Sequence, residues 1–592
     1  MNASTSPPEP RRAHDLSTAD APRHPRGDRA RVLLTSVFGP YARDDDDGSR
    51  AINPMELYHN QVTRVQGPFS LRMFHRSWGL MLIQANLDAP CTLLDFPQKD
   101  RFVAELTGRT YDVIGISAII PNLTKVQRMC ELIREHQPQA QIVIGGHVAN
   151  LPGLADRVDA DHVVKGEGVR WFRAYLGEDV DRPIRHPRVL SGIGARAMGV
   201  ALPEKPGDVA ATLIPSVGCP MGCNFCSTSA MFGGKGRHID FFKTGDELFE
   251  VMCDLERSLG VWSFFVMDEN FLLHRKRALR LLELMKEHDK SWALYVFSSA
   301  NVLESYTIDE LVGLGISWVW MGLEGEASRY VKLAGADTRT LVRTLQSHGI
   351  RVLGSTIIGL EAHDADNLDA AIDYAVSHDT EFHQFMLYTP IPGTPLWDEM
   401  ASQGRLTDTD FRETAEFHGQ LRFNYRHDRL EPGAETGFLI KAFERDFEVN
   451  GPSVIRVART TLAGWKRYRR HPDPRVRRRF EREGKGLATV HAGAVWAGRR
   501  WFADQPAARA KLDATWRDLC SACGVKARLA GPTIGRYILR KLKQEDAKLE
   551  AGWTYEPPTF YEQTHQPTRD PAPRPAEAPG RWVPPMTLPT PA

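Results

Sequence analysis

The stretch Gly218-Cys219-Pro220-Met221-Gly222-Cys223-Asn224-Phe225-Cys226 places three cysteines in the spacing CxxxCxxC, directly after a short apolar run at 212–214. Cysteine thiolates bind iron–sulfur clusters, and a four-iron cluster usually takes four of them. Three leave one iron open, as a catalytic metal site requires. A zinc loop and a chance group of buried cysteines are the alternatives. No CxxC or HxxxH pair follows within the next fifty residues, which disfavours zinc.

This motif resembles the cluster-binding loop of the radical S-adenosylmethionine (SAM) enzymes. The resemblance implies that Cys219, Cys223 and Cys226 hold a 4Fe-4S cluster whose fourth iron is chelated by the amino and carboxylate groups of SAM. It also implies that the reduced cluster cleaves SAM to a 5′-deoxyadenosyl radical, with the electron supplied by an external reductant of the flavodoxin or ferredoxin type. Phe225 would shield the cluster or stack on SAM.

Composition sets broad limits on the protein. The 592 residues are enough for two or three domains, and the 42% hydrophobic and 25% charged residues are typical of a globular protein. A formal net charge of +1 gives no electrostatic case for nucleic acid. No apolar run is long enough for a membrane span. Cysteines in an oxygen-sensitive type of motif predict a reducing cytoplasm.

The first half alternates strands and helices. Apolar, β-branched runs at 31–37, 92–96, 112–117, 141–146 and 162–164 predict strands, and residues 71–87 and 123–135 predict helices. This pattern predicts a Rossmann or flavodoxin-like parallel sheet over residues 31–180. Parallel sheets of this kind bind ligands at the carboxyl ends of their strands.

The strand ends of this half resemble the cobalamin-binding domain that precedes the radical SAM domain in one large subclass. The resemblance implies cobalamin contacts from a set of small and polar residues: Ser117, Gly145, Gly146, His147, Gly166, Glu167 and Gly168. The DxHxxG motif that supplies a cobalt ligand in the classical form is missing here. His147 is a candidate cobalt ligand or a hydrogen-bond donor, and a cofactor-free flavodoxin-like domain is the alternative.

The second half contains six strand–helix units. After the strand at 212–214, further strands are predicted at 262–267, 293–297, 318–324, 352–358 and 384–388. Six units are too few for a closed eight-stranded barrel, so residues 210–400 are predicted to form a partial (β/α)6 TIM barrel. The resemblance implies SAM contacts at its strand ends from Asp268, Ser298, Ser299, Glu324 and Gly359. Loop hydrogen bonds or helix caps are the alternative role for each.

The remaining segments carry weaker signals. Residues 1–30 and 556–592 are predicted to be disordered, 181–209 to be a linker, and 401–555 to be a mostly helical domain. An arginine-rich run at 475–482 is interpreted as a solvated helix face, with a surface for an anionic substrate or RNA as the alternative. Cys520 and Cys523 form a lone CxxC, too few cysteines for an auxiliary cluster.

These patterns together favour a cobalamin-dependent radical SAM enzyme resembling the class B methyltransferases. The implied reaction transfers a methyl group from methylcobalamin to an unactivated carbon or phosphorus centre of a small-molecule, lipid or peptide substrate, and SAM renews the methyl group. One alternative is a non-methylating rearrangement or cyclisation within the same family. An alternative of another class is a non-enzymatic cobalamin or redox sensor.

Overall fold

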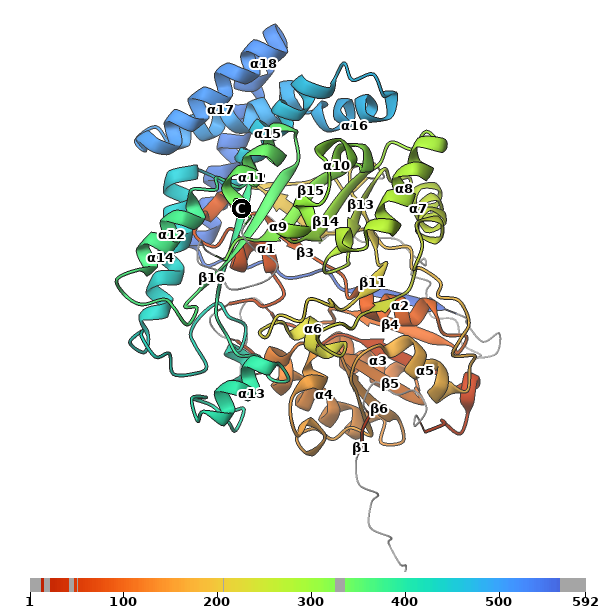
Figure 1. Ribbon diagram of the computed structural model, residues 1–592. Coiled ribbons are helices and arrows are strands. Elements are labelled where there is room, and N and C mark those ends of the chain that lie inside the picture. Colours follow the sequence, from red (N-terminus) through yellow and green to blue (C-terminus); the bar gives the residue numbers. More distant parts are fainter. Residues whose placement is uncertain are drawn as a thin grey trace, which may run out of the picture. The chain divides into compact units, whose positions relative to one another are not determined.

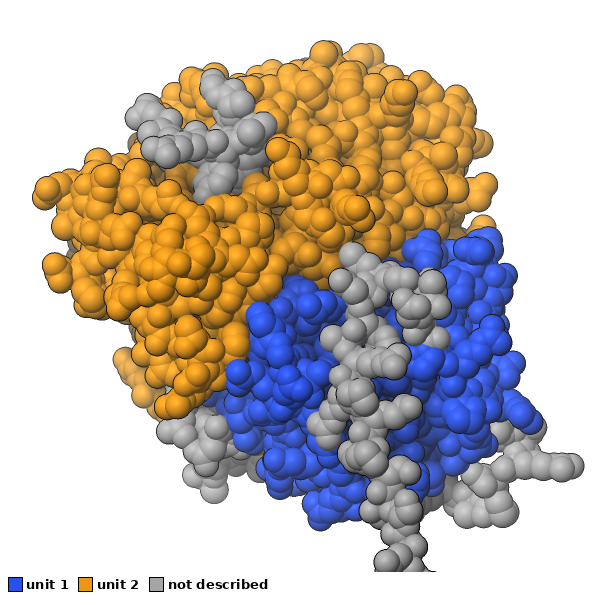
Figure 2. All heavy atoms as spheres, turned by 60° about the horizontal axis from the view of Figure 1, so that its bottom comes forward, with its two compact units in different colours: residues 1–50, 76–187, 556–592 blue, residues 51–75, 188–555 orange. Residues whose placement is uncertain are grey.

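The chain is described by a computed structural model that covers residues 12–14, 22–41, 47–49, 52–205, 207–324 and 336–564. It divides into two compact units (Figure 2). Unit 1 contains residues 1–50, 76–187 and 556–592, and unit 2 contains residues 51–75 and 188–555. Residues 51–75 therefore belong to unit 2, although the sequence groups them with the first domain. Among the described residues, no helix has the length and apolarity that a bilayer crossing needs.

Unit 1 is built on a seven-stranded sheet. Its strand order is β1 (Arg12–His14), β7 (His162–Val164), β6 (Gln141–Gly145), β5 (Val113–Ser117), β2 (Val32–Thr35), β4 (Cys91–Asp95) and β18 (Phe560–Thr564). All neighbouring strands run parallel except the β4–β18 pair. The Val, Ile and Leu side chains of β2, β4 and β5 are buried because a parallel sheet is covered on both faces. The order in which strands are added switches sides at β2: β4 lies on one side of β2, and β5, β6 and β7 follow on the other side.

The helices of unit 1 are α2 (Trp78–Ala85), α3 (Lys99–Gly108), α4 (Leu123–His136) and α5 (Gly168–Leu176). Helix α2 packs on α5 at Gly168, where an added Cβ would lie only 2.7 Å from Ile83 Cδ1. The predicted helix at 71–87 is correct only in its second part. Residues Arg72–Phe74 form strand β3 of unit 2. Strand β18 falls within the segment predicted to be a disordered tail, which is wrong for these five residues.

Unit 2 contains a six-stranded parallel sheet in chain order. The strands are β10 (Ala211–Leu213), β13 (Ser263–Val266), β14 (Ala293–Ser298), β15 (Ile316–Gly322), β16 (Arg351–Ile358) and β17 (Phe382–Leu387). Helices α7 (Gly245–Leu259), α8 (Arg275–Glu287), α10 (Ile308–Leu314), α11 (Thr338–Ser347) and α12 (Leu368–Val376) follow in the connections (Figure 1). Capping boxes begin α7 at Thr244 and α10 at Thr307. The mixed α/β class with parallel sheets is as predicted.

The segment predicted to be a linker also has regular structure. Strands β8 (Ile193–Ala197) and β9 (Val200–Ala201) join β3 in a small antiparallel sheet. The C-terminal part of unit 2 is helical, as predicted: α13 (Pro395–Ser402), α14 (Ala434–Asn450), α15 (Ser453–Tyr468), α16 (Pro474–Gly484), α17 (Ala492–Trp501) and α18 (Pro506–Glu550). Helix α18 bends at Gly524, whose φ of 61° and ψ of −141° are not helical.

The arginine-rich helix α16 is attached to the sheet of unit 2. Arg475 and Arg479 are buried, and their guanidinium groups donate to Lys290 O and Ile316 O, both at 3.1 Å. These carbonyls lie just before β14 and at the first residue of β15. The interpretation of this run as a solvated face is therefore wrong for both arginines, which satisfy backbone acceptors at the amino ends of two strands.

The buried His383 on β17 predicts an acid-sensitive fold. Its ring hydrogen-bonds Thr356 Oγ1 at 2.9 Å and Thr380 Oγ1 at 3.2 Å, and burial lowers its pKa to about 3. The unfolded chain takes up this proton near pH 6.5 and the folded chain does not, so stability is full above pH 6.5 and falls as the pH drops toward 3. His383 alone contributes a slope of about 1.4 kcal/mol per pH unit over this range.

Melting temperature measured against pH checks this prediction. His383→Gln should make the acid limb of the curve less steep, because glutamine does not titrate. The exposed His288 provides the matched control, since His288→Gln should leave the limb unchanged. Equal acid sensitivity in the His383 variant and the parent chain would contradict the assignment.

Candidate functional site

The three motif cysteines lie in one curled loop of unit 2. The loop follows β11 (Ser216–Val217), which pairs with β12 (Ile239–Asp240), and Cys226 caps helix α6 (Ser227–Met231). The Cys226 N–H donates to Cys223 O at 3.0 Å, and the Ser229 hydroxyl donates to Cys219 O at 2.8 Å. Gly222 has a φ of +65°, and an added Cβ would lie 2.5 Å from Lys235 Cβ. The turn therefore requires glycine at this position.

The electrostatics of the loop suit a cationic cluster. Burial, together with the charges of Cys226, Cys223 and Glu269, raises the pKa of the Cys219 thiol to about 11. Three thiolates this close oppose one another's ionisation unless a positive centre joins them. The donor set therefore fits the predicted iron–sulfur cluster. The other five cysteines occupy β4, α4, α7 and α18.

Phe225 and its neighbour are fixed by the segment that follows β17. The Leu396 N–H donates to Asn224 O at 3.0 Å, and the Asn224 amide donates to the Tyr388 hydroxyl at 3.3 Å. The Phe225 ring meets the Tyr388 ring edge-on, with centroids 6.1 Å apart. Phe225 is only partly buried, so one part of its ring stays accessible beside the cysteines. Its contact with SAM stays a prediction.

Asp268, at the end of β13, is engaged by the protein itself. Its carboxylate accepts from Ser216 Oγ at 2.6 Å, from Arg277 Nη2 at 2.5 Å and from the Asn270 N–H at 3.1 Å. The side chains of Asp268 and Arg277 are each 2% exposed. Asp268 therefore links Ser216, which lies shortly before the cysteine loop, to the end of β13. Its predicted contact with SAM is not tested by these bonds.

The neighbouring strand end carries a polar network that includes two predicted residues. Ser298 Oγ donates to Asn270 Oδ1, and the Asn270 amide donates to Ser299 Oγ, both at 3.2 Å. Ser299 Oγ donates to Asn301 Oδ1 at 2.8 Å. The structure thus brings Ser298 and Ser299 together with Asn270 and Asn301, two further polar residues that follow these strands.

The last two predicted SAM residues follow the next two strands. Glu324 is 3% exposed and comes two residues after β15. Gly359 comes directly after β16, and the N–H groups of Gly359 and Leu360 donate to His363 Nδ1 at 3.1 and 3.2 Å. The Phe423 ring covers Gly359, where an added Cβ would lie 2.3 Å from Phe423 Cζ. Both residues end parallel strands, so they lie at the same edge of the sheet as Ser298.

The sequence prediction missed Glu269, which lies beside the cysteine loop. Burial raises its pKa to about 7, and Glu269 Oε2 has no hydrogen-bond partner within the described residues. Its charge acts on Cys219. A signal was present in the sequence, because Asp268-Glu269-Asn270 directly follows an apolar strand. Nothing in that tripeptide indicates which of the three faces the cysteines.

The sequence also missed a helix from segment 51–75 that lies on the sheet of unit 2. Helix α1 (Leu57–Gln61) places Tyr58 6.4 Å from the Trp320 ring and 6.5 Å from the Phe382 ring. The Gln384 amide donates to Gln61 Oε1 at 2.7 Å. His75, at the end of the segment, stacks on Phe265 at 5.3 Å. Segment 51–75 thus covers β13, β15 and β17 with aromatic and amide groups.

In unit 1, four predicted cobalamin residues meet at the ends of β5 and β6. The Ala118 N–H donates to Gly145 O at 3.2 Å. Gly146 has a φ of +80°, and an added Cβ would lie 2.8 Å from Ser117 Oγ. At Gly145, by contrast, the nearest atom to an added Cβ is Val164 O at 3.9 Å, so that side is open. The backbone at Gly145 therefore has no close neighbour on its Cβ side, whereas Gly146 is tightly packed against Ser117 and Ala118.

His147 follows these glycines and is partly exposed, but one of its ring nitrogens is buried. Its Nδ1 atom has no partner within the part of the chain that the structure describes, and burial lowers its pKa. A neutral imidazole with an unused nitrogen suits either a cobalt ion or a cofactor amide. The donor set of unit 1 therefore fits cobalamin, while the axial ligand stays a prediction.

The other three predicted cobalamin residues have local structural roles. Glu167 caps α5 by accepting from the Arg170 N–H at 3.2 Å, and it pairs with Arg170 Nη1 at 3.3 Å. Burial raises its pKa. Gly166 has a φ of +84°, and Gly168 allows the close packing of α2 on α5. Their contact with cobalamin stays a prediction.

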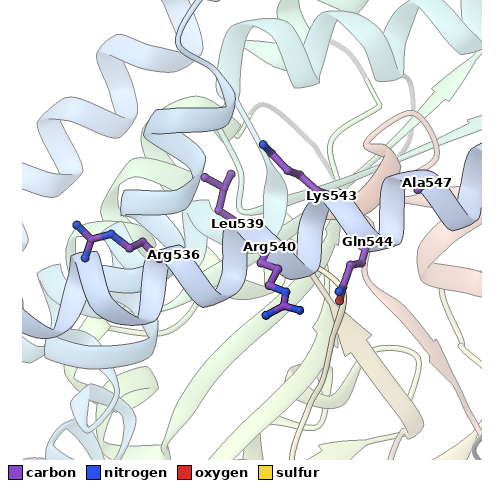
Figure 3. A pocket seen from close by; sticks show the side chains of 6 residues that line it. All are labelled: Arg536, Leu539, Arg540, Lys543, Gln544 and Ala547. Atoms are coloured by element: carbon purple, nitrogen blue, oxygen red, sulfur yellow. The ribbon is translucent and has the colours of Figure 1, made fainter. Parts of the chain in front are cut away.

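A separate groove runs along α18 and is lined by six residues: Arg536, Leu539, Arg540, Lys543, Gln544 and Ala547 (Figure 3). Its volume is about 460 Å³. Three of the lining side chains are basic, and none is a cysteine, histidine or carboxylate. The groove can attract an anion, but it offers no ligand for a cluster or for cobalt.

Comparisons with known proteins support the interpretation of unit 1. Residues 71–176 match the B12 binding domain family. The chain is 25% identical over 340 residues to an uncharacterized methyltransferase of Pyrococcus horikoshii, covering 51% of this chain and 72% of that protein. It is 29% identical over 209 residues to the bacteriochlorophyllide d C-12(1)-methyltransferase of Chlorobaculum tepidum, covering 34% of this chain and 45% of that protein.

Among solved structures, the chain is similar to a radical S-adenosylmethionine methyltransferase from Kitasatospora setae with cobalamin and a [4Fe-4S] cluster bound. The TM-score is 0.48 at 15% identity, and the match covers 77% of this chain and 99% of that chain.

Proposed function

We propose that this chain, which belongs to the radical SAM enzymes with a B12-binding domain, is a cobalamin-dependent methyltransferase acting on an unactivated carbon or phosphorus centre. The single observation that carries the proposal is the curled loop of Cys219, Cys223 and Cys226, whose thiols act on one another electrostatically and which follows the parallel strand β10 through the short strand β11. The matched B12 binding domain and the methyltransferase relatives indicate the second cofactor and the reaction.

We further propose a division of roles between the two units. The six-stranded sheet of unit 2 would be the partial barrel of the radical SAM fold, and the sheet of unit 1 the Rossmann-like cobalamin domain. When bound, the cluster and cobalamin would supply an electron and a transferable methyl group. A flavodoxin or ferredoxin in a reducing cytoplasm would deliver the electron.

The residues of the chain would bind and orient these groups. Phe225, Ser298, Ser299, Glu324 and Gly359 would contact SAM at the strand ends, while Asp268 holds Ser216 and Asn270 in place. Ser117, Gly145, Gly146 and His147 would contact cobalamin. The buried polar network around Asn270 is already hydrogen-bonded, so a bound ligand would meet groups in fixed orientations.

The aromatic side chains that lie on the unit 2 sheet would contact the substrate. Phe297 and Trp320 stack at 5.0 Å, and Tyr58 lies against Trp320. Burial raises the pKa of Tyr58 to about 12, yet its side chain is not fully enclosed. Aromatic faces bind apolar groups and exclude water, which protects a reactive intermediate from quenching. An apolar small molecule is therefore the substrate class we propose.

Anaerobic reconstitution of the full chain with iron, sulfide and hydroxocobalamin tests the function. After desalting, the absorption spectrum should show both the broad cluster band and the corrin bands. Retention of the cluster alone would remove the methyltransferase proposal and leave unit 1 as a scaffold. With a methyl acceptor present, product mass separates methyl addition, which adds one methylene unit, from a cyclisation or rearrangement.

Gly145→Phe should remove cobalamin without unfolding unit 1. An added Cβ at Gly145 would meet no atom closer than 3.9 Å, so the backbone accepts a side chain there, and the ring would occupy the strand end where cobalamin is proposed to bind. We expect the corrin bands to be lost after desalting while the melting temperature and the cluster band are retained. Gly79→Phe on α2, where nothing lies within 4 Å of an added Cβ, is the control. Full corrin retention in Gly145→Phe would place the cofactor elsewhere.

A further inference from the structure

Two histidines and an aspartate converge beside the cysteine loop. His238 precedes β12, Asp240 belongs to it, and His274 precedes α8. One ligand atom from each lies within 4.8 Å of the other two. His238 Nε2 is 3.1 Å from Asp240 Oδ2, and the two imidazole rings are 4.8 Å apart between centroids. We propose that His238, Asp240 and His274 form a second metal site, which binds a divalent cation of the zinc type.

The donor set and its spacing suit that cation. Two imidazoles and one carboxylate are ligands that Zn²⁺ takes with bond lengths of about 2.0–2.2 Å, and a tetrahedral site spaces such ligands about 3.4 Å apart. The His238–Asp240 distance is already close to that value. The remaining separations, at most 4.8 Å, need a closure of about 1.4 Å or less, which side-chain rotation supplies.

The surrounding charges leave the site able to accept a cation. Arg277 Nη1 lies 3.4 Å from Asp240 Oδ1, while Asp240 Oδ2 faces His238. The Arg277 charge is balanced by Asp268, whose Oδ2 is 2.5 Å from Nη2, so Asp240 leaves a net negative charge at the site. Arg277 also holds the aspartate in place, as groups around metal ligands commonly do. Burial lowers the pKa of His274, and the neutral imidazole is the form that binds metal.

The position of the site indicates what a bound ion would do. The glycine-rich stretch at 233–238 packs against the cysteine loop: the Gly236 N–H donates to Pro220 O at 2.8 Å, and Lys235 touches Gly222. A metal joining His238 and Asp240 to His274 would fasten the end of that stretch to the start of α8. The stretch at 233–238, which packs against the cysteine loop, would then be held at both ends. We therefore expect the ion to slow the loss of cluster iron.

Cobalt(II) titration of the full chain tests the site. Cys219, Cys223 and Cys226 are replaced with alanine so that the motif thiolates cannot bind the probe. We expect one equivalent of Co²⁺ to give the visible bands of a nitrogen- and oxygen-ligated ion, without a thiolate-to-cobalt charge-transfer band, and one equivalent of Zn²⁺ to displace it. His274→Gln and Asp240→Asn should each weaken binding at least tenfold.

Three comparisons keep the proposal falsifiable. His288→Gln, at the other end of α8, should bind Co²⁺ like the parent chain, and circular dichroism should show that every variant is folded. Binding that is unchanged in His274→Gln, or that appears only as a charge-transfer band from Cys520 and Cys523, would overturn the site. So would the absence of stoichiometric binding. Metal analysis of the cluster-loaded chain with its native cysteines should find zinc beside iron, and this result is independent of the methyltransferase proposal.

Discussion

Replacing Cys223 with alanine is expected to abolish both iron retention and SAM cleavage. Two thiolates cannot hold a cluster that already lacks one protein ligand, and the Cys226 N–H donates to the backbone oxygen of residue 223, so the loop itself keeps its shape. Iron analysis after anaerobic reconstitution and mass spectrometry of 5′-deoxyadenosine in the presence of dithionite and SAM measure the two losses. Both should fall to the background of the protein-free reaction.

Cys253→Ala is the matched control for this experiment. Cys253 lies on α7 of the same unit and is partly exposed, but it does not belong to the cysteine loop. We expect its iron content and 5′-deoxyadenosine yield to equal those of the parent chain. A Cys223→Ala variant that retains its cluster, or a Cys253→Ala variant that loses it, would show that the ligands have been misidentified.

Replacing Arg277 with methionine should destabilise unit 2 by about 3–5 kcal/mol. The variant leaves the Asp268 carboxylate buried with no cation beside it, and an isolated buried charge costs far more than the pair gains. Chemical denaturation followed by tryptophan fluorescence measures the loss. Asp268→Asn in the same chain should recover part of it, because it removes the unpaired charge.

The same helix provides a control. Arg280 also pairs with an aspartate, Asp246, at 2.9 Å, but both side chains are solvent-accessible. Arg280→Met should change stability little because water solvates the remaining charge. A similar loss in both variants would mean that α8 responds to any change in its arginines rather than to the buried pair.

The parts of the fold that could be predicted are those that depend on the residue pattern of a single short segment. Short Val- and Ile-rich runs separated by amphipathic stretches predicted the strands of both sheets, because parallel strands are buried on both faces. The cysteine loop could be predicted because the metal chemistry fixes both residue type and spacing. The packing of segment 51–75 on unit 2 and of strand β18 on unit 1 could not be predicted, because the residue pattern of a segment does not indicate which unit it packs on.

The strand-end residues show a second limit of sequence reasoning. Asp268 and Glu167 occupy positions where ligand-binding carboxylates are expected, and the structure adds local partners that the sequence does not predict, because one pairs with Arg277 and the other caps α5. A carboxylate after a strand satisfies the same sequence pattern whether it meets a ligand or a buried arginine. Only the three-dimensional neighbours show such local partners, and they also identify Glu269, whose charge acts on Cys219 in the cysteine loop.

Strand β18, which completes the sheet of unit 1, affects how the protein folds during translation. Residues 560–564 pair with β4, so the sheet that begins with the first strands of the chain is complete only after the ribosome has added residue 564. Unit 2 has all its residues by position 555 and can fold earlier in translation. Until then, β4 presents an unpaired edge that invites association between nascent chains. Truncation before residue 560 should make that edge permanent.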